Sequence, residues 1–429
     1  MLRYPCRALA ITQALALLFA MNLSLASAEE FPTFDQLQPS AELPALLIDE
    51  AGKPITTAEA WSKKRDTLKA QFQHWMYGRL PPKPAQVKYE TLFTDEKALG
   101  GKATVREIRI SFVEPALSKR QHVLLVTPNG VEKPGVFIGM NFCGNHTVLP
   151  DTKIALPEGW VGKGCVGVEN ERATDAGRGA QTEVWNAELI VSRGYALATF
   201  YSGDIDPDTP DLADGIGPAF YKPGQTAAEG DDAGTIALWA WGFHRVADLV
   251  TTEFKDTIDA SKIASVGHSR NGKTALLAAA MDDRFSIAIP SQAGCGGTAP
   301  SRGKVGEQVK QINKNFPHWF CDNFLLFNEH PDLLPFDQHA LVAICAPRAV
   351  LFANAEEDTW ANPMGQFEVL QAAEPVFKLL GTSGLAEAKE PVMNQLVGGR
   401  LGFFYRPGKH SMSTTDWTAY LDFADQQWK

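Results

Sequence analysis

Short apolar runs alternate with amphipathic stretches along most of the chain. Apolar or alternating runs predict strands at 105–112, 122–127, 135–142, 196–201, 263–266, 285–290, 348–354 and 402–406. Helical spacing predicts helices at 185–192, 235–249, 362–380 and 417–428, and another that follows the strand at 263–266 and reaches residue 280. The first three strands are expected to be antiparallel neighbours. Strands and helices that alternate in this way form a mainly parallel, doubly wound α/β sheet with helices on both faces.

Three segments do not follow this alternation. Residues 29–100 are rich in proline and contain one helical stretch at 57–75. A segment this short has difficulty burying a core of its own, so we expect an N-terminal extension that wraps the main domain. The stretches 202–232 and 291–340 are long insertions, and loops of that length are usually functional or mobile. Neither a repeat nor a domain linker is visible, so we expect one catalytic domain over 29–429.

The first 28 residues have the pattern of an export signal. Arg3 and Arg7 precede an apolar stretch at 8–25, and Ala26-Ser27-Ala28 follows it. This order is typical of a secretory signal peptide, cleaved here after Ala28. A retained membrane anchor is the alternative, but polar residues interrupt the stretch. No later apolar run is long enough for a membrane span. We therefore expect a protein exported to the periplasm or the medium, with no membrane association after cleavage.

The charge balance and the cysteines narrow the function classes. Losing Arg3 and Arg7 with the signal peptide moves the formal net charge from −10 to −12. An acidic protein is a poor ligand for nucleic acid or for anionic membranes. None of the remaining cysteines has the spacing of a metal site, so a zinc or iron–sulfur site has little support. We expect no metal and no cofactor. Their number is odd and their pairing stays open; we expect a monomer. The five are Cys143, Cys165, Cys295, Cys321 and Cys345.

A nucleophile elbow is predicted where the strand at 263–266 meets the helix after it. The segment reads IASVGHSRNGKTALLAAA, and such a turn lifts a serine, here Ser269, above the end of a parallel sheet. Gly267 stands at the usual place two residues before the serine. Asn271 stands where a second glycine is usual, and Gly272 comes one place late. Taken alone the motif is weak, and a buried serine at a helix N-terminus is the alternative.

Two more polar residues follow later predicted strands. In open α/β sheets ligands bind beyond the carboxyl ends of the strands. Ser269, Asp358 and His410 all stand there, in the chain order that the α/β-hydrolase fold uses for its nucleophile, acid and base. The imidazole takes the proton of the serine hydroxyl, and the carboxylate fixes the tautomer of the imidazole. The sequence therefore predicts a serine hydrolase.

Alternatives remain for two members of this set. His339 is a rival base, but it precedes the strand at 348–354 and breaks the expected order. Glu356 and Glu357 adjoin Asp358, and a run of three acids is often a solvated turn. The choice of acid among these three stays open.

The run Gly267-His268-Ser269-Arg270-Asn271-Gly272-Lys273 resembles the G-x-S-R-N-G-K signature of the glucuronoyl esterases, carbohydrate esterase family 15. The resemblance covers most of the mature chain. Its other segments are Asn141-Phe142-Cys143-Gly144-Asn145-His146, Gly203-Asp204-Ile205-Asp206-Pro207, Asp337-Gln338-His339 with Ala346-Pro347-Arg348, and Pro407-Gly408-Lys409-His410. It implies an α/β-hydrolase fold and cleavage of the esters that join 4-O-methyl-glucuronic acid of xylan to lignin alcohols. Glucuronoxylan and lignin–carbohydrate esters would be its partners.

The resemblance also implies roles for individual residues. Ser269 would be the nucleophile and His410 the base. Arg270 would serve the oxyanion hole through its backbone N–H and its guanidinium, and an ion pair on the rim of the site is the alternative. Three residues would hold the uronic sugar, where charged groups and an indole suit hydroxyl recognition. They are Lys273, Glu307 and Trp360.

The chain departs from the family pattern at Gln292. Many members, the fungal ones especially, place the acid as a glutamate at this point, and glutamine cannot carry the negative charge. Some bacterial relatives use an acid after the later strand, which Asp358 followed by Trp360 matches. We expect Asp358→Asn to lower kcat by orders of magnitude and Gln292→Ala not to.

Other functions stay open at this point. The chain is also compatible with a different esterase, such as an acetylxylan esterase or a small lipase-like enzyme. A non-catalytic carbohydrate-binding homologue is disfavoured by the intact serine, histidine and late acid. A peptidase of the same fold has little support, because the chain shows no propeller-like repeats.

Overall fold

The computed structural model describes residues 1, 31–115 and 117–429. The predicted signal peptide and its cleavage site after Ala28 lie outside the described residues. Within the described part, none of the helices has the length and apolar character needed to cross a membrane.

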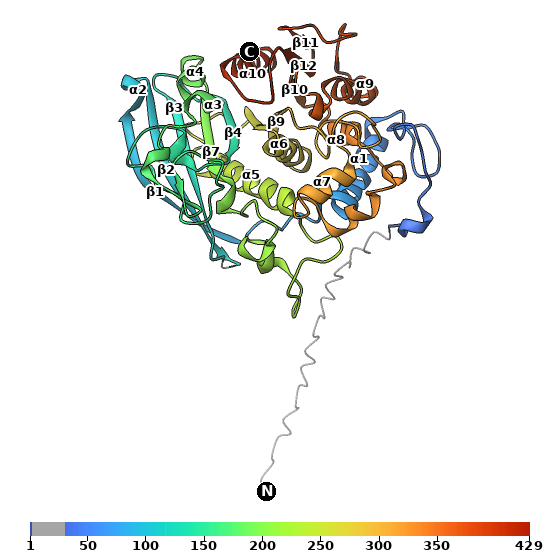
Figure 1. Cartoon of the computed structure of the whole chain (residues 1–429), viewed down its shortest axis with the longest axis horizontal. Helices are drawn as coiled ribbons and strands as arrows, with labels where there is room; N and C mark the ends of the chain where they lie inside the picture. The colour runs from blue at the N-terminus through green and yellow to red at the C-terminus, as the bar shows by residue number, and fades with distance from the viewer. Residues whose placement is uncertain (2–30, 116) are drawn as a thin grey trace.

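A ten-stranded mixed sheet runs through the molecule (Figure 1). Its strand order is β1-β2-β3-β7-β4-β8-β9-β10-β12-β11. The pairs from β1 to β7 are antiparallel, those from β7 to β12 are parallel, and β11 returns antiparallel to β12. The strands are β1 Gln86–Lys97, β2 Ala103–Glu114, β3 Arg120–Pro128, β4 Val136–Asn141, β7 Ala196–Tyr201, β8 Ile263–His268, β9 Phe285–Ser291, β10 Ala349–Ala355, β11 Leu396–Gly398 and β12 Leu401–Arg406. A separate small hairpin pairs β5 Val168–Glu169 with β6 Arg172–Ala173.

The helices follow the predicted alternation. They are α1 Ala58–Phe72, α2 Ala98–Gly101, α3 Thr182–Trp185, α4 Ala187–Ser192, α5 Thr235–Thr252, α6 Arg270–Met281, α7 Val309–Asn315, α8 Gln338–Cys345, α9 Pro363–Leu379 and α10 Thr414–Trp428. The predicted helix at 185–192 is divided, because Asn186 adopts a left-handed conformation between α3 and α4. The α/β prediction is confirmed.

Two apolar cores cover the two faces of the sheet. Successive side chains of a strand point to opposite faces, and in β4 Ile138 packs into one core while Phe137 packs into the other. The larger core joins the sheet to α1, α5, α6, α8 and α9, and the smaller core joins it to α4 and α10. Strands buried on both faces read as continuous apolar runs, which is why β7 and β10 were predictable from sequence.

The predicted antiparallel arrangement is wrong for β4. β2 and β3 do pair antiparallel, but β7 lies between β3 and β4. β4 is parallel to both of its neighbours, β7 and β8. The segment that crosses from β4 to β7 contains α3 and α4, and a crossover of this kind returns the chain parallel to the strand it left.

The N-terminal segment takes part in the sheet as well as covering it. α1 buries Trp61, Leu68 and Phe72 and packs against α8. β1 pairs with β2 at the edge of the sheet. β1 was not predicted, because an edge strand with no fully buried residue has little apolar signal. α7 and α8 were also missed, inside and at the end of the second insertion.

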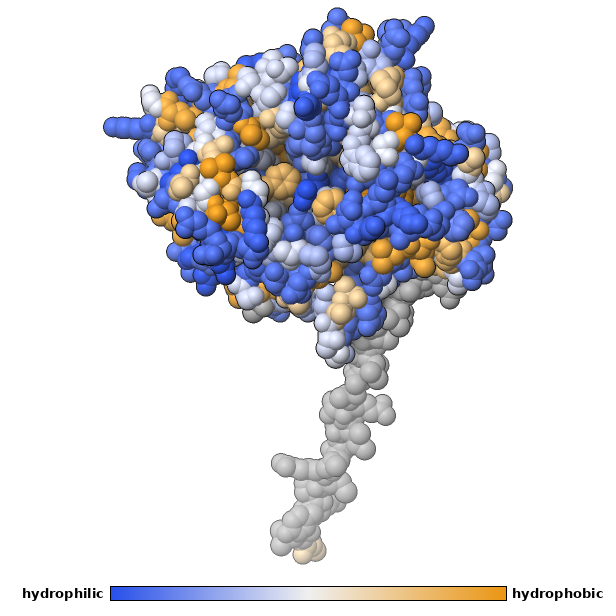
Figure 2. Space-filling view, in the orientation of Figure 1, coloured by the Kyte–Doolittle hydropathy of each residue, from blue (hydrophilic) through white to orange (hydrophobic). Residues whose placement is uncertain are grey.

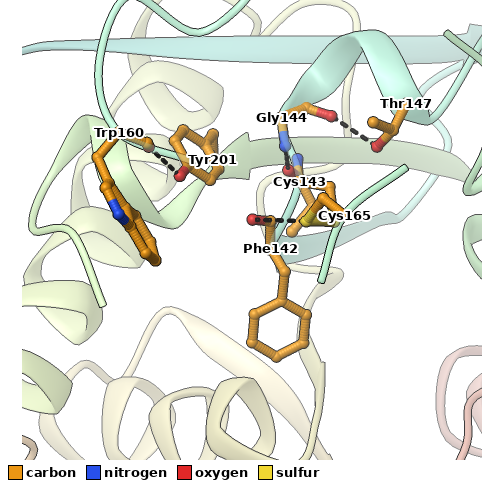
Figure 3. Close-up of a disulfide and its surroundings, with 8 residues drawn as sticks. Phe142, Cys143, Gly144, Thr147, Trp160, Cys165 and Tyr201 are labelled. Atoms are coloured by element: carbon orange, nitrogen blue, oxygen red, sulfur yellow. Dashed lines mark hydrogen bonds between the residues drawn. A yellow bond between two sulfur atoms is a disulfide. The ribbon is translucent and has the colours of Figure 1, made fainter. Parts of the chain in front are cut away.

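A disulfide joins Cys143 to Cys165 (Figure 3). The other three cysteines of the described part, Cys295, Cys321 and Cys345, are free and buried. The surface seen in Figure 2 is hydrophilic over most of its area, with apolar residues scattered across it.

Candidate active site

Ser269 lies in the sharp turn between β8 and α6, as the elbow pattern predicts. Its backbone has φ 59° and ψ −126°, a combination that is costly for any residue other than glycine and that occurs most often at functional sites. The Ser269 N–H donates to the carbonyl of Ser291 at the end of β9, at 2.9 Å. The neighbouring strand therefore helps to hold the strained turn.

The contacts around the turn explain why its glycines stand at Gly267 and Gly272 rather than at the usual spacing. A Cβ on Gly267 would lie 2.1 Å from the carbonyl oxygen of Asn271, so this position admits only glycine. A Cβ on Gly272 would lie 3.0 Å from the carbonyl oxygens of both Gly267 and Ser291. Gly272 thus permits the close approach of helix to strand. Asn271 is buried, and its amide donates to the carbonyl of Met140 at the end of β4, at 2.6 Å.

His410 and Asp358 are brought together at the same edge of the sheet. Nδ1 of His410 lies 2.6 Å from Oδ2 of Asp358, which is only 6% exposed. Glu356 and Glu357 are exposed, and their backbone N–H groups donate to the carbonyls of Arg406 and Gly408. Among the three adjacent acids, Asp358 is the one that contacts the imidazole.

The rival base lies elsewhere. His339 is buried in α8, and its Nε2 lies 2.8 Å from the carbonyl oxygen of Pro44 in the N-terminal segment. It fastens that segment to α8, outside the cavity that contains Ser269.

Gln292 supports the loop that carries His410, a role that the sequence did not reveal. Its Nε2 donates to the carbonyl of Ser411 at 2.7 Å, and its Oε1 accepts from the Ser411 N–H at 3.0 Å. Arg406 donates to the same carbonyl at 2.8 Å and is ion-paired with buried Asp416. The residue beside His410 is therefore held from two directions.

A second histidine packs against the first. The ring centroids of His268 and His410 lie 4.3 Å apart. Burial, together with the neighbouring His410, lowers the pKa of His268 to about 3. His268 is therefore neutral at ordinary pH, so it does not place a permanent positive charge beside His410.

The predicted site residues line one cavity of about 300 Å³. Its walls include Ser269, Arg270, Lys273, Gln292, Glu307, Phe316, Trp319, Asp358, Trp360 and His410. Two hollows of about 380 Å³ lie elsewhere, one at the start of α9 and one between β12 and α10. Although larger, neither of them is lined by Ser269, Asp358 or His410.

The guanidinium of Arg270 is held on several sides. It is ion-paired through Nη1 with Asp208, a residue of the first insertion. Its Cζ lies 5.5, 5.1 and 4.7 Å from the ring centroids of Phe142, Phe316 and Trp319. Cations favour such positions over aromatic faces. Its Nε is buried and has no hydrogen-bond partner within the described part of the chain.

Lys273, Glu307 and Trp360 all line this cavity. Lys273 is buried, and its ammonium donates to the carbonyls of Ala293 and, at 2.6 Å, Cys295. Burial lowers its pKa, although nearby Glu307 opposes this. Burial likewise raises the pKa of Glu307. The Glu307 N–H donates to the carbonyl of Trp360 at 2.9 Å, and Trp360 is 52% exposed.

A serine, an imidazole that contacts a carboxylate, and two cations therefore line one cavity, and these are the kinds of group that acyl transfer by a serine nucleophile uses. No group of three or more His, Cys, Asp or Glu side chains among the described residues is arranged to hold a metal ion.

Comparisons with known proteins agree with this chemistry. A family model described as "Glucuronyl esterase, fungi" matches residues 177–381. "Carbohydrate esterase MZ0003", from an unknown prokaryotic organism, is 42% identical over 399 residues, 91% of each chain.

Two solved structures superpose on this chain with a TM-score of 0.84. One is a promiscuous CE15 esterase from a marine bacterial metagenome, 41% identical and covering 92% of this chain and 98% of its own. The other is the glucuronoyl esterase from Solibacter usitatus, 36% identical and covering 92% and 100%. The chain accordingly belongs to the glucuronoyl esterases of carbohydrate esterase family 15, which are carboxylic ester hydrolases with the α/β-hydrolase fold.

Proposed function

We propose that the protein cleaves esters between 4-O-methyl-glucuronic acid of glucuronoxylan and lignin alcohols through an acyl-enzyme on Ser269. The observation that carries the proposal is the single cavity that combines Ser269, the His410–Asp358 pair and two buried or half-buried cations, Arg270 and Lys273. A nucleophile, a base and fixed positive charge are what acyl transfer on a polar acyl group requires.

The reaction proceeds in two half-reactions. Oγ of Ser269 attacks the ester carbonyl carbon while Nε2 of His410 takes the hydroxyl proton. The carbonyl oxygen becomes negative and is stabilised by the N–H groups at the start of α6 and by Arg270. Collapse breaks the bond to the alcohol oxygen, which receives the proton from His410 and leaves as the free alcohol. Water then attacks the acyl-enzyme, again giving a proton to His410, and the glucuronic acid leaves as the proton returns to Ser269.

The sugar of the acyl group would lie against Lys273, Glu307 and Trp360. Lys273 and Glu307 offer a donor and an acceptor to ring hydroxyls, and the half-exposed indole of Trp360 offers an apolar face. Because the Lys273 ammonium is also bonded to two backbone carbonyls, it holds the wall of the cavity in shape as well as facing the substrate.

We also propose that the protein is exported and acts as a monomer. Export rests on the pattern of residues 1–28 and is supported by the Cys143–Cys165 disulfide, since disulfides persist mainly in oxidising compartments.

Hydrolysis of benzyl glucuronoate and of para-nitrophenyl acetate, compared on the wild type and Ser269→Ala, tests the function. We expect a clear preference for the glucuronoate in kcat/KM and loss of both activities in the variant. Preference for the acetate would instead support a more general carbohydrate esterase. That second candidate has an observation in its favour, because the relative described as promiscuous is 41% identical to this chain.

Labelling with a fluorophosphonate distinguishes an active esterase from a non-catalytic carbohydrate-binding protein. An esterase is labelled at Ser269. A non-catalytic homologue would bind a glucuronoxylan fragment without label and without product.

A further inference from the structure

Asp208 is the residue that ties the catalytic turn to both insertions. It lies in the first insertion, beyond the run Gly203-Asp204-Ile205-Asp206-Pro207. Its Oδ2 accepts from Nη1 of Arg270, in the elbow. Its Oδ1 lies 2.8 Å from Nε2 of His318 and accepts from Nε1 of Trp319 at 2.8 Å, both in the second insertion. One carboxylate therefore makes three polar contacts.

The neighbouring acids of the same loop, Asp204 and Asp206, make contacts away from the catalytic turn. Asp204 binds the backbone N–H of His122 at 2.8 Å, and Asp206 accepts from the hydroxyl of Thr235 at 2.6 Å. Both fasten the loop to the body of the protein. The contacts of Asp208 differ, because two of its three partners, Arg270 and Trp319, line the cavity that contains Ser269. The third, His318, precedes Trp319 in the chain and lines a neighbouring hollow together with residues of the loop that follows Asp208.

We propose that Asp208 is a positioning residue, which holds the guanidinium of Arg270 in the orientation that stabilises the negative oxygen of the transition state. This inference rests on the proposed function, because it assigns Asp208 a role through Arg270. The carboxylate binds one edge of the planar guanidinium, and the rings of Phe142, Phe316 and Trp319 lie against it. A guanidinium held in this way has lost its rotational freedom before the substrate arrives.

The edge of the guanidinium that Asp208 does not bind has an unfilled donor. Nε of Arg270 is buried and has no hydrogen-bond partner among the described residues. Buried donors are rarely left unpaired. The Arg270 side chain as a whole is 29% exposed and lines the cavity, so a guanidinium already held by Asp208 can meet the oxygen of the reacting ester without reorganisation.

Asp208 is charged when it performs this role. Burial raises the pKa of its carboxyl, but the hydrogen bond from His318 and the charge of Arg270 outweigh burial and hold the pKa below its usual value. An amide at this position keeps the shape of the side chain but removes the charge. It also places an N–H₂ group where one of the three donors now binds. Asp208→Asn is therefore expected to release Arg270 without emptying the space.

A double-mutant cycle on benzyl glucuronoate tests the proposal, with active sites counted by fluorophosphonate labelling. We expect Asp208→Asn to lower kcat per labelled site by about 10-fold to 100-fold with KM changed by less than about 2-fold, since a lost oxyanion donor mainly lowers kcat. In an Arg270→Ala background, Asp208→Asn should lower kcat by less than about 2-fold more, because coupled residues are not additive.

Asp211→Asn is the matched control. Asp211 belongs to the same loop and is exposed, and within the described part of the chain its side chain makes one polar contact, accepting the N–H of Ala213 at 2.9 Å. Its kcat should equal that of the wild type. If Asp208→Asn has no cooperative unfolding transition, Asp208→Glu replaces it in the cycle. The longer side chain keeps the charge but moves the carboxylate, and it should lower kcat in the same coupled way.

The outcomes separate this inference from the proposed function. Normal kcat in Asp208→Asn, or losses that multiply in the double variant, would overturn the role of Asp208 alone. An active Ser269→Ala would overturn the proposed mechanism. Normal kcat in Arg270→Ala with an inactive Ser269→Ala would leave the serine mechanism in place and remove the positioning role.

Discussion

Nδ1 of His410 lies 2.6 Å from Oδ2 of Asp358, and this contact joins the loops that follow two paired parallel strands. Ala355, at the end of β10, is in register with Arg406, at the end of β12. Asp358 and His410 follow these two residues by a few positions each. Parallel register therefore brings the acid and the imidazole together, although 52 positions separate them in the chain.

Replacement of the acid should disable the enzyme without unfolding it. We expect Asp358→Asn to lower kcat by about 10⁴, the effect typical when the tautomer of a catalytic imidazole is no longer fixed. Glu357→Gln is the control, because the Glu357 side chain is exposed and its structural contact is made by the backbone. Steady-state kinetics on benzyl glucuronoate measure both. Near-normal turnover in Asp358→Asn would show that another acid serves His410.

Loss of the Gln292 side chain should lower kcat, but by less than loss of the Asp358 carboxylate. Gln292→Ala removes two hydrogen bonds to the backbone of Ser411, each worth about 1 kcal/mol. Since Arg406 still holds Ser411, we expect kcat to fall by at most about 10-fold. The midpoint temperature of thermal unfolding should decrease slightly.

Gln292→Glu tests whether the family's glutamate would be accepted here. A carboxylate can still accept from the Ser411 N–H but would face the Ser411 carbonyl as a second acceptor. We expect the glutamate variant to be less stable than Gln292→Ala in thermal unfolding. A loss of kcat in Gln292→Ala as large as that in Asp358→Asn would contradict the lesser role.

Reduction of the disulfide should weaken both the fold and the site. The bridge between Cys143 and Cys165 closes a chain separation of 22 residues, and a loop of this size is expected to contribute about 3 kcal/mol. Phe142, beside Cys143, lies over the Arg270 guanidinium (Figure 3 shows Phe142 and the disulfide together). We therefore expect Cys143→Ser with Cys165→Ser to have a lower urea midpoint and a lower kcat. An unchanged urea midpoint would contradict the structural contribution.

Acid should destabilise the fold in the range where buried histidines take up protons. Burial lowers the pKa of His244 to about 4 and that of His268 to about 3. The unfolded chain binds these protons near the usual value of about 6.5. The contribution of these two neutral histidines to the free energy of unfolding is therefore fully present above a pH of about 6.5 and is lost as the pH falls toward about 4. Urea midpoints measured from pH 7 to pH 4 should decrease.

The variant His244→Gln isolates one of these groups. Nε2 of His244 lies 2.9 Å from the carbonyl of Ala278, a bond that an amide can replace. The variant should be less stable at pH 7 but should lose less stability on acidification. An equally steep decline in the variant would show that His244 is not a source of the pH dependence.

The sequence by itself determined the class of fold, the candidates Ser269 and His410, and the run of three acids, Glu356 to Asp358, from which the acid would come. It could do so because strands buried on both faces are continuous apolar runs, and because residues just after parallel strands must meet at one edge of the sheet. Only the tertiary structure decided that β7 separates β3 from β4, that Asp358 rather than a neighbouring glutamate contacts His410, and which cysteines pair. It also decided that Gln292 holds the His410 loop and Asp208 holds Arg270. These features depend on side chains that come from distant segments and meet in space, and no local spacing in the sequence records such meetings.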